Sequence, residues 1–164
     1  MPEENFKTNF LKKENIFSLV LLLIIFSVDR FTKIRIINSQ AAENTIFIND
    51  FLNYELVWNT GIGFGLFSLE ASITYHIVTF IIFILILFLF FLTIKSKGTE
   101  KFLYTFIMGG ALGNFYDRCT FYAVPDFIDL HVSDFHWFTF NIADIFISIG
   151  IILIILKEIS MKKT

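Results

Sequence analysis

Long apolar stretches separated by short polar segments dominate this chain. Four of them, at residues 16–36, 73–94, 102–118 and 140–156, have the composition of membrane helices. A helix needs about 20 residues to cross the roughly 30 Å hydrocarbon core of a bilayer. The stretch at 73–94 is the clearest, because it is almost entirely apolar. The pattern therefore predicts an α-helical integral membrane protein with four transmembrane helices.

The first predicted span contains charged residues near one end. Its apolar part stops before Asp29, so a helix of full membrane length must continue through Asp29 to residue 36. Lys33 lies four positions after Asp29 and therefore on the same helical face. We expect these two side chains to form a structural ion pair, which would allow both charges to lie inside the span.

The third predicted span is rich in glycine. Gly109 and Gly113 are four residues apart, with Gly110 between them. Small residues at this spacing let two helices approach closely in lipid. We expect this helix to be packed against its neighbours.

Residues 38–72 form a polar and aromatic segment between the first two spans. Apolar residues at 45–48 precede an alternation of Tyr54, Leu56 and Trp58 with polar neighbours, which suits a pair of strands. We expect a small extracytoplasmic β subdomain between helices 1 and 2. Its aromatic residues, including Trp58, Phe64 and Phe67, suit the headgroup layer of the membrane.

Composition and charge limit the possible partners. The chain has 164 residues, 55% of them hydrophobic, with a mean hydropathy of +0.70, which is the size of one membrane-embedded domain over residues 1–164. The net charge of −2 offers no basic face for a nucleic acid. Lysines cluster before span one, between spans two and three, and after span four, which places both termini in the cytoplasm. Four basic residues fall on the opposite side, and the first three of them weaken that assignment: Arg30, Lys33, Arg35 and Arg118.

Two aspartates carry the candidate chemistry. Asp126 precedes span four in a polar loop and Asp144 lies near the start of that span. Carboxylates beside hydrocarbon are costly to keep and so mark a functional site. Two that meet tend to share a proton, so that one can act as a base toward water and the other as an acid. Peptide hydrolysis needs this division and requires no metal or cofactor.

Other polar residues recur on the same helical faces as this pair. Asn114, Asp117 and Arg118 stand at i, i+3 and i+4 at the end of span three, so they can share one face. Asn141 and Ser148 fall on one stripe with Asp144. Amide and guanidinium groups of this kind could orient the carboxylates and a substrate carbonyl.

Simpler interpretations exist for several of these residues. Taken singly, an aspartate at a membrane boundary is more often a helix cap or a solvated loop residue, and Asn59 with Gly61 suits a plain turn. Asp117 is a rival for the first aspartate of the pair. A further group alternates carboxylate and imidazole, and it suits solvated loop residues better than a metal site: Asp129, His131, Asp134 and His136.

Five segments occur in the order found in one known family. They are DRFTK at 29–33, NTGIGFGLF at 59–67, GGALGNFYDR at 109–118, VPDFI at 124–128 and FNIAD at 140–144. Together they resemble bacterial lipoprotein signal peptidase, also called signal peptidase II. The resemblance implies a monomeric aspartic endopeptidase of the bacterial cytoplasmic membrane, with its active site near the outer face. Its partners would be membrane lipid and diacylated prolipoproteins, whose signal peptide is cut off on the amino side of the lipidated cysteine.

The resemblance also assigns roles to residues. It makes Asp126 and Asp144 catalytic, and Asp29 and Lys33 structural. Substrate binding or support of the aspartate pair falls to Asn59, Gly61, Asn114, Arg118 and Asn141.

Two positions depart from the family pattern. Pro125 stands where valine is usual and removes one backbone N–H, and Ile145 replaces a small polar residue. Ser148 could supply the hydroxyl that Ile145 lacks.

Two other classes of function remain open at this stage. One is a small proton-coupled transporter that uses Asp29, Asp117 and Asp144 as ion sites, although its acidic groups would lie at mid-membrane and not at one end. The other is a scaffold without catalytic activity.

Overall fold

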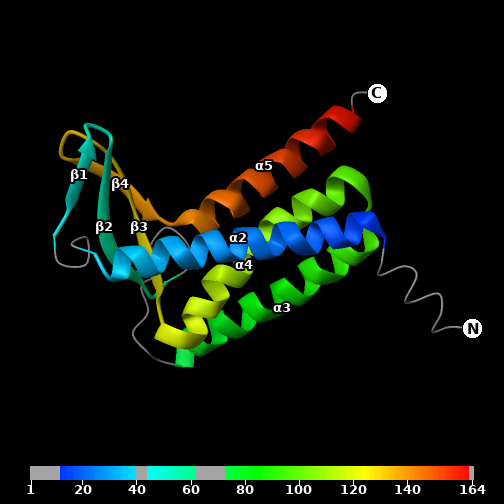
Figure 1. Ribbon diagram of the computed structural model, residues 1–164, viewed down its shortest axis with the longest axis horizontal. Coiled ribbons are helices and arrows are strands. Elements are labelled where there is room, and N and C mark those ends of the chain that lie inside the picture. The colour runs from blue at the N-terminus through cyan, green and yellow to red at the C-terminus, as the bar shows by residue number, and fades with distance from the viewer. Residues whose placement is uncertain (1–11, 40–43, 62–72, 163–164) are drawn as a thin grey trace, which may run out of the picture.

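The computed structural model describes residues 12–39, 44–61 and 73–162, which form a helix bundle with a sheet at one end (Figure 1). The helices in the described residues are α2 (Lys13–Ile37), α3 (Ile73–Lys95), α4 (Gly98–Phe121) and α5 (Ile142–Met161). The strands are β1 (Ile46–Asn49), β2 (Leu52–Asn59), β3 (Val124–Val132) and β4 (Phe135–Phe140).

Helix α4 is the centre of the bundle, because it packs against α2, α3 and α5. Its glycines make these contacts close. A methyl group on Gly109 would press on Ile25 of α2, and one on Gly113 would meet the carboxylate of Asp29. A methyl group on Gly110 would collide with the backbone of Ala143 in α5. The predicted close packing through small residues is confirmed.

The helices follow the predicted spans with shifted ends. Helix α2 does continue through Asp29, as its length required, and α4 extends beyond the predicted 102–118 at both ends. The fourth span was expected to begin at residue 140, but Phe140 belongs to β4 and Asn141 caps the helix. Two segments of the described residues, Lys13–Ile37 and Tyr75–Lys95, are long and apolar enough to cross a membrane. Helices α4 and α5 carry charges such as Lys101, Asp117 and Lys157, and four crossings therefore remain a prediction.

The sheet is larger than the sequence indicated. Its order is β1-β2-β3-β4, with every neighbouring pair antiparallel. The strand pair predicted within 38–72 is present as β1 and β2, but the other half comes from the segment between α4 and α5. The prediction of a subdomain confined to the first interhelical segment is therefore wrong. Apolar and polar residues alternate in β3 from Ile128 to Val132, but the polar Asp129 and His131 are the buried ones, and Asp126 of the same strand is buried as well.

A small apolar cluster fixes the sheet to the bundle. Ile36, at the end of α2, packs with Phe127 of β3, and Tyr54 and Leu56 of β2 lie against them. Ile142, the first residue of α5, joins the same cluster. Because α2, the sheet and α5 meet here, β3 is held beside the first turn of α5. Phe64 and Phe67, predicted to lie at the membrane interface, fall outside the described residues.

Candidate active site

Asp126 of β3 and Asp144 of α5 line one cavity of ≈ 290 Å³. Its polar wall also includes side chains from β2, α4 and α5, and its apolar wall comes mainly from α3, α4 and α5. The lining residues are Asn59, Ile82, Ala111, Asn114, Arg118, Val124, Asp126, Asp144, Ile147, Ser148 and Ile151. The two aspartates were expected to meet, and the structure brings them to the same space.

Two asparagine amides hold the Asp126 carboxylate. Asn59 Nδ2 donates to Oδ2 at 2.8 Å and Asn141 Nδ2 donates to Oδ1 at 2.6 Å. Asp126 is only 2% exposed, and the register of β2 and β3 places it opposite Val57, two residues before Asn59. Both oxygens therefore have a donor, which fixes the plane of the carboxylate.

Asn141 joins the two aspartates. It is the N-cap of α5: its Oδ1 accepts from the backbone N–H of Asp144 at 3.1 Å, and its own N–H donates to Asp144 Oδ2 at 3.1 Å. This reciprocal capping box is typical of helix N-termini. Because the same side chain donates to Asp126 through Nδ2, one residue sets the position of both carboxylates.

Asp144 is linked through Asn114 to a network of buried charged residues. Asn114 Nδ2 donates to Asp144 Oδ1 at 2.8 Å, and Asn114 Oδ1 accepts from Lys33 Nζ at 2.8 Å. Lys33 also pairs with Asp29 at 2.8 Å and with Asp117 at 2.7 Å. The predicted ion pair between Asp29 and Lys33 is confirmed, with both side chains fully buried.

Asp29 further connects α2 to α5. Its Oδ1 accepts the backbone N–H of Ala143 at 3.0 Å, which is a free donor of the first turn of α5. The N-terminus of α5 is thus held by a side chain from α2 as well as by its own cap.

Arg118 connects the cavity to the end of β2. Its Nη2 donates to the carbonyl of Gly61, whose N–H in turn donates to Asn59 Oδ1 at 2.9 Å. Its Nη1 is buried and has no hydrogen-bond partner among the described residues. Arg118 is also one of the residues that line the cavity.

Electrostatics separate Asp126 from an ordinary aspartate. Burial raises the pKa of Asp126 to about 7, with the nearby Asp144 carboxylate acting in the same direction and the Asn59 and Asn141 amides opposing it. Near neutral pH, Asp126 can therefore carry a proton that a solvated aspartate would have lost.

A comparison with protein families decides the identity. The model of signal peptidase (SPase) II matches residues 21–160. The chain belongs to the signal peptidase II family. It is 46% identical to the lipoprotein signal peptidase of Pelagibacter ubique over 90% of this chain and 91% of that protein. It is 36% identical to the one from Thermodesulfovibrio yellowstonii, over 85% and 92% of the two chains.

The fold also agrees with a solved structure. A bacterial membrane enzyme determined by the in meso method at 2.3 Å resolution superposes with a TM-score of 0.71. The two share 32% sequence identity, and the match covers 88% of each chain. This signal peptidase II family member thus has the fold of a bacterial membrane enzyme with a small antiparallel sheet, and its family is one of proteases.

The residues assigned from sequence largely gather around this cavity of the signal peptidase II family member. Asn59, Gly61, Asn114, Arg118 and Asn141 are all linked by hydrogen bonds to Asp126, to Asp144 or to one another. Asp117, the rival aspartate, does not line the cavity and instead pairs with Arg30 and Lys33. Ser148 lines the cavity, as a substitute for the missing hydroxyl at Ile145 would have to.

Sequence reasoning missed two supporting residues. Arg30 was counted only as a charge on the outer side, yet it pairs with buried Asp117. Its position, one residue after Asp29 and three before Lys33, could have indicated that Arg30 belongs to the same charge network. Tyr75, 1% exposed, donates its hydroxyl to the carbonyl of Arg118 at 3.0 Å, and no local pattern announced it.

Proposed function

We propose that this protein removes the signal peptide from diacylated prolipoproteins as an aspartic endopeptidase, cutting on the amino side of the lipidated cysteine. The observation that carries the proposal is that Asp126 and Asp144 line one cavity and are both held by Asn141. The family relationship supports the substrate class, because relatives such as that of Pelagibacter ubique are lipoprotein signal peptidases.

In this mechanism Asp126 is the acid and Asp144 the base. Asp144 takes a proton from a water molecule, whose oxygen adds to the scissile carbonyl carbon, while Asp126 gives its proton to the carbonyl oxygen. The tetrahedral intermediate then collapses: the C–N bond breaks, the nitrogen takes a proton from Asp144, and Asp126 regains one from the hydroxyl group. The pKa of Asp126, about 7, suits it to hold the proton that this scheme requires.

In this proposal Arg118 binds a substrate carbonyl. Its Nη2 is used by Gly61, while Nη1 has no partner among the described residues and belongs to a cavity-lining side chain. A guanidinium holds its two donors in a fixed fork. Arg118 would therefore align the substrate backbone beside the aspartates.

The apolar wall of the cavity suits a signal segment. Ile82 of α3, Ala111 of α4 and Ile147 and Ile151 of α5 form this wall. Ile151 is also among the exposed apolar residues of the bundle surface. A substrate held in the bilayer by its signal helix and acyl chains could therefore reach the aspartates without leaving the apolar phase.

Charge placement supports the proposed orientation. The start of α2, the turn between α3 and α4, and the end of α5 lie at the end of the bundle opposite the sheet (Figure 1). Lysines of the described residues collect there: Lys12, Lys13, Lys95, Lys97, Lys101, Lys157 and Lys162. By the positive-inside rule this end faces the cytoplasm of a bacterium and the sheet lies outside. A single four-span domain that acts as a monomer in the inner membrane completes the proposal.

The transporter alternative finds no support in this arrangement. It requires Asp29, Asp117 and Asp144 as ion sites, but Asp29 is paired with Lys33, and Asp117 with both Lys33 and Arg30. Only Asp144 of these three lines the cavity.

A cleavage assay with purified protein tests the proposal. Asp126→Asn and Asp144→Asn should each lower the cleavage rate of a diacylated precursor by about 100-fold or more, because each removes one proton-transfer group. Asp50→Asn, at an exposed turn between β1 and β2, is the matched control and should cleave like the unmodified protein. An unlipidated precursor should remain uncut.

Two results would contradict the proposal. Near-normal cleavage by either active-site variant would remove that aspartate from the mechanism. Absence of cleavage by the unmodified protein, with the precursor intact and the protein folded, would favour a scaffold or transporter.

A further inference from the structure

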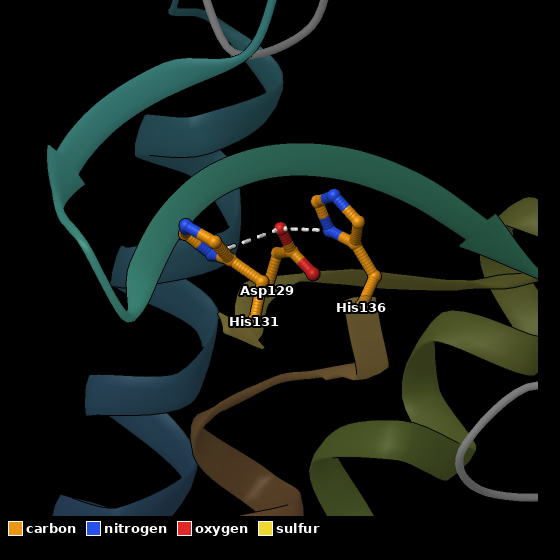
Figure 2. Close-up of side chains that lie close together, drawn as sticks. All are labelled: Asp129, His131 and His136. Carbon is orange, nitrogen blue, oxygen red and sulfur yellow. Dashed lines mark hydrogen bonds and ion pairs between the residues drawn. The ribbon is translucent and has the colours of Figure 1, made fainter. Parts of the chain in front are cut away.

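A second cluster of titratable side chains lies in the β3–β4 hairpin, apart from the cavity. Asp129 and His131 belong to β3 and His136 to β4, where His131 and His136 are paired in register. Asp129 Oδ2 lies 2.8 Å from His136 Nδ1 and 3.7 Å from His131 Nδ1. Figure 2 shows the carboxylate between the two imidazole rings, with a ring nitrogen of each turned toward it.

The sequence favoured solvated loop residues at these positions, but most of the cluster is buried. Asp129 is 2% exposed and His131 is 9% exposed. His136 closes the outer side, with half of its side chain exposed. The solvated-loop interpretation is therefore wrong for Asp129 and His131. It holds for Asp134, which lies exposed in the turn and outside the cluster.

Two polar atoms of this cluster make no hydrogen bond among the described residues. His131 Nδ1 is buried and makes no hydrogen bond among the described residues, and the same is true of Asn53 Oδ1. Asn53 belongs to β2, and its Nδ2 donates to Asp129 Oδ2 over a long 3.4 Å. Buried polar atoms without partners are rare and costly, because water is lost and nothing replaces it. Two in one cluster indicate that a ligand is shared between them.

We propose that Asp129, His131 and His136 bind a divalent transition-metal ion of the Zn²⁺ class. Two imidazoles and one carboxylate form a ligand set suited to such an ion, whereas Mg²⁺ and Ca²⁺ prefer oxygen ligands alone. One ligand atom from each residue can be chosen so that all lie within 4.8 Å of one another. Zn²⁺ binds imidazole nitrogen at about 2.0–2.1 Å, so two ligand atoms of one tetrahedral ion lie about 3.3–3.4 Å apart. The 2.8 Å contact of Asp129 with His136 therefore has to open slightly, and ligand atoms as far as 4.8 Å apart have to close by about an ångström or more, which side-chain rotation must supply.

The fourth position can be filled in two ways. The buried amide of Asn53 can turn its oxygen to the ion, which would satisfy Oδ1 and remove the long hydrogen bond from Nδ2. Otherwise a water molecule completes the tetrahedron on the exposed side of His136. In either arrangement His131 Nδ1 gains a close contact, whereas its present approach to Asp129 Oδ2 is 3.7 Å.

The ion would act on the hairpin and not on the peptide bond. Asp129 is three residues after Asp126 on β3, and β4 leads directly into Asn141. An ion that joins β3 to β4 therefore fixes the two chain segments that carry Asp126 and the cap of α5. Its contribution is to stability and to the position of the site.

Zn²⁺ titration of the purified full-length protein, prepared without a histidine tag, tests this inference. The chain has only three histidines, which supplies a matched control. The unmodified protein should bind one Zn²⁺ per chain, and His136→Gln should weaken binding by about tenfold or more. His131→Asn should weaken it similarly. His76→Gln, in α3 against Tyr75 and Tyr122, should bind as tightly as the unmodified protein.

Thermal unfolding supplies the second measurement. Zn²⁺ should raise the melting temperature of the unmodified protein and of His76→Gln, but not that of His136→Gln, and Mg²⁺ should have no effect on any of them. His136 is half exposed, so its variant keeps the test valid even if His131→Asn fails to fold. Unchanged Zn²⁺ binding in His136→Gln, or equal loss in His76→Gln, would overturn the inference.

Discussion

Asn141 caps α5 with its side-chain oxygen and holds Asp126 with its side-chain nitrogen, so a helix terminus and a strand carboxylate share one amide. The cap requires Oδ1 to face the backbone N–H of Asp144, and this leaves Nδ2 pointing toward β3. Stability and geometry of the site are thus set by different atoms of one side chain. Substitutions can separate the two.

Serine and alanine at position 141 should separate these two roles. Asn141→Ser retains an oxygen that can cap the helix but has no amide to donate to Asp126, whereas Asn141→Ala loses both. The serine variant should therefore be more stable than the alanine variant by about 1 kcal/mol. Both should cleave slowly. Thermal unfolding and cleavage rates, measured on the same preparations, check this, and a serine variant with normal activity would remove the role given to Nδ2.

The stability of the protein should depend on the proton of Asp126. Because the pKa of Asp126 is about 7 in the folded protein and the ordinary pKa of an aspartate is 3.8, the folded protein keeps a proton that the unfolded chain releases between these values. The contribution of this proton to the free energy of unfolding is full below about pH 4. It decreases by about 1.4 kcal/mol per pH unit as the pH rises to 7, and above pH 7 it no longer changes.

Asp126→Asn is the variant that isolates this effect. Asparagine stays neutral, so the free energy of unfolding of the variant relative to the unmodified protein should rise between pH 4 and pH 7. Asp50→Asn, at the exposed turn between β1 and β2, is measured alongside as the control variant. A constant difference between Asp126→Asn and the unmodified protein across this range would show that Asp126 ionises normally.

The pH dependence of cleavage should follow the same proton. If Asp126 is the acid, kcat/KM should fall above about pH 7, where the free enzyme loses the proton. Single-turnover rates from pH 5 to pH 9 on a diacylated precursor check this. A rate that stays constant through pH 8.5 would exclude Asp126 as the proton donor.

Lys33 neutralises two buried aspartates, so its removal should be severe. Lys33→Met leaves Asp29 without a countercharge and Asp117 with Arg30 alone, and it should destabilise the protein by about 3–5 kcal/mol. The double variant Lys33→Met/Asp29→Asn should recover part of that loss because it removes the uncompensated charge. Lys162→Met, at the exposed end of α5, is the control. Denaturation in detergent measures each, and equal stability of the single and double variants would contradict the charge argument.

Arg118 should not be replaceable by lysine. Arg118→Lys keeps the positive charge but cannot reach both the Gly61 carbonyl and the cavity, so kcat/KM should fall by about 10-fold to 100-fold. Arg35→Lys, at an exposed position in the last turn of α2, provides the matched control and should cleave normally. A normal rate in Arg118→Lys would mean that Nη1 binds no substrate oxygen.

The helices and the first two strands were predictable because their signals are local. Apolar runs as long as 73–94 have few alternatives, and the alternation around Tyr54 favours a strand. Strands β3 and β4 were missed although residues 128–132 alternate apolar and polar side chains, because Asp129 and His131 were interpreted as solvated loop residues, whereas both are buried in the sheet. The burial of the polar residues in β3 depends on partners distant in sequence, such as Asn59 and Asn53, which no local pattern contains.

The sequence predicted which residues gather around the cavity, but it did not predict the hydrogen bonds that join them. The order of the sequence motifs indicated Asp126, Asp144 and the asparagines as site residues. Helical spacing predicted the ion pair between Asp29 and Lys33. The chain of contacts from Lys33 through Asn114 to Asp144 joins three helices, so it depends on tertiary packing. For the same reason Asp117 remained a rival until its pairing with Arg30 was seen.

The attachment of α2 to the site has a consequence for protein engineering. Asp29 accepts a hydrogen bond from the backbone N–H of Ala143, and Lys33 donates one to Asn114. Helix α2 is therefore hydrogen-bonded to the residues that hold the candidate site. A chimera that borrows α2 from an unrelated membrane protein would insert normally yet lack both groups. Introducing only an aspartate and a lysine at the positions of Asp29 and Lys33, on the same face of the borrowed helix, is the smallest change that would restore both hydrogen bonds.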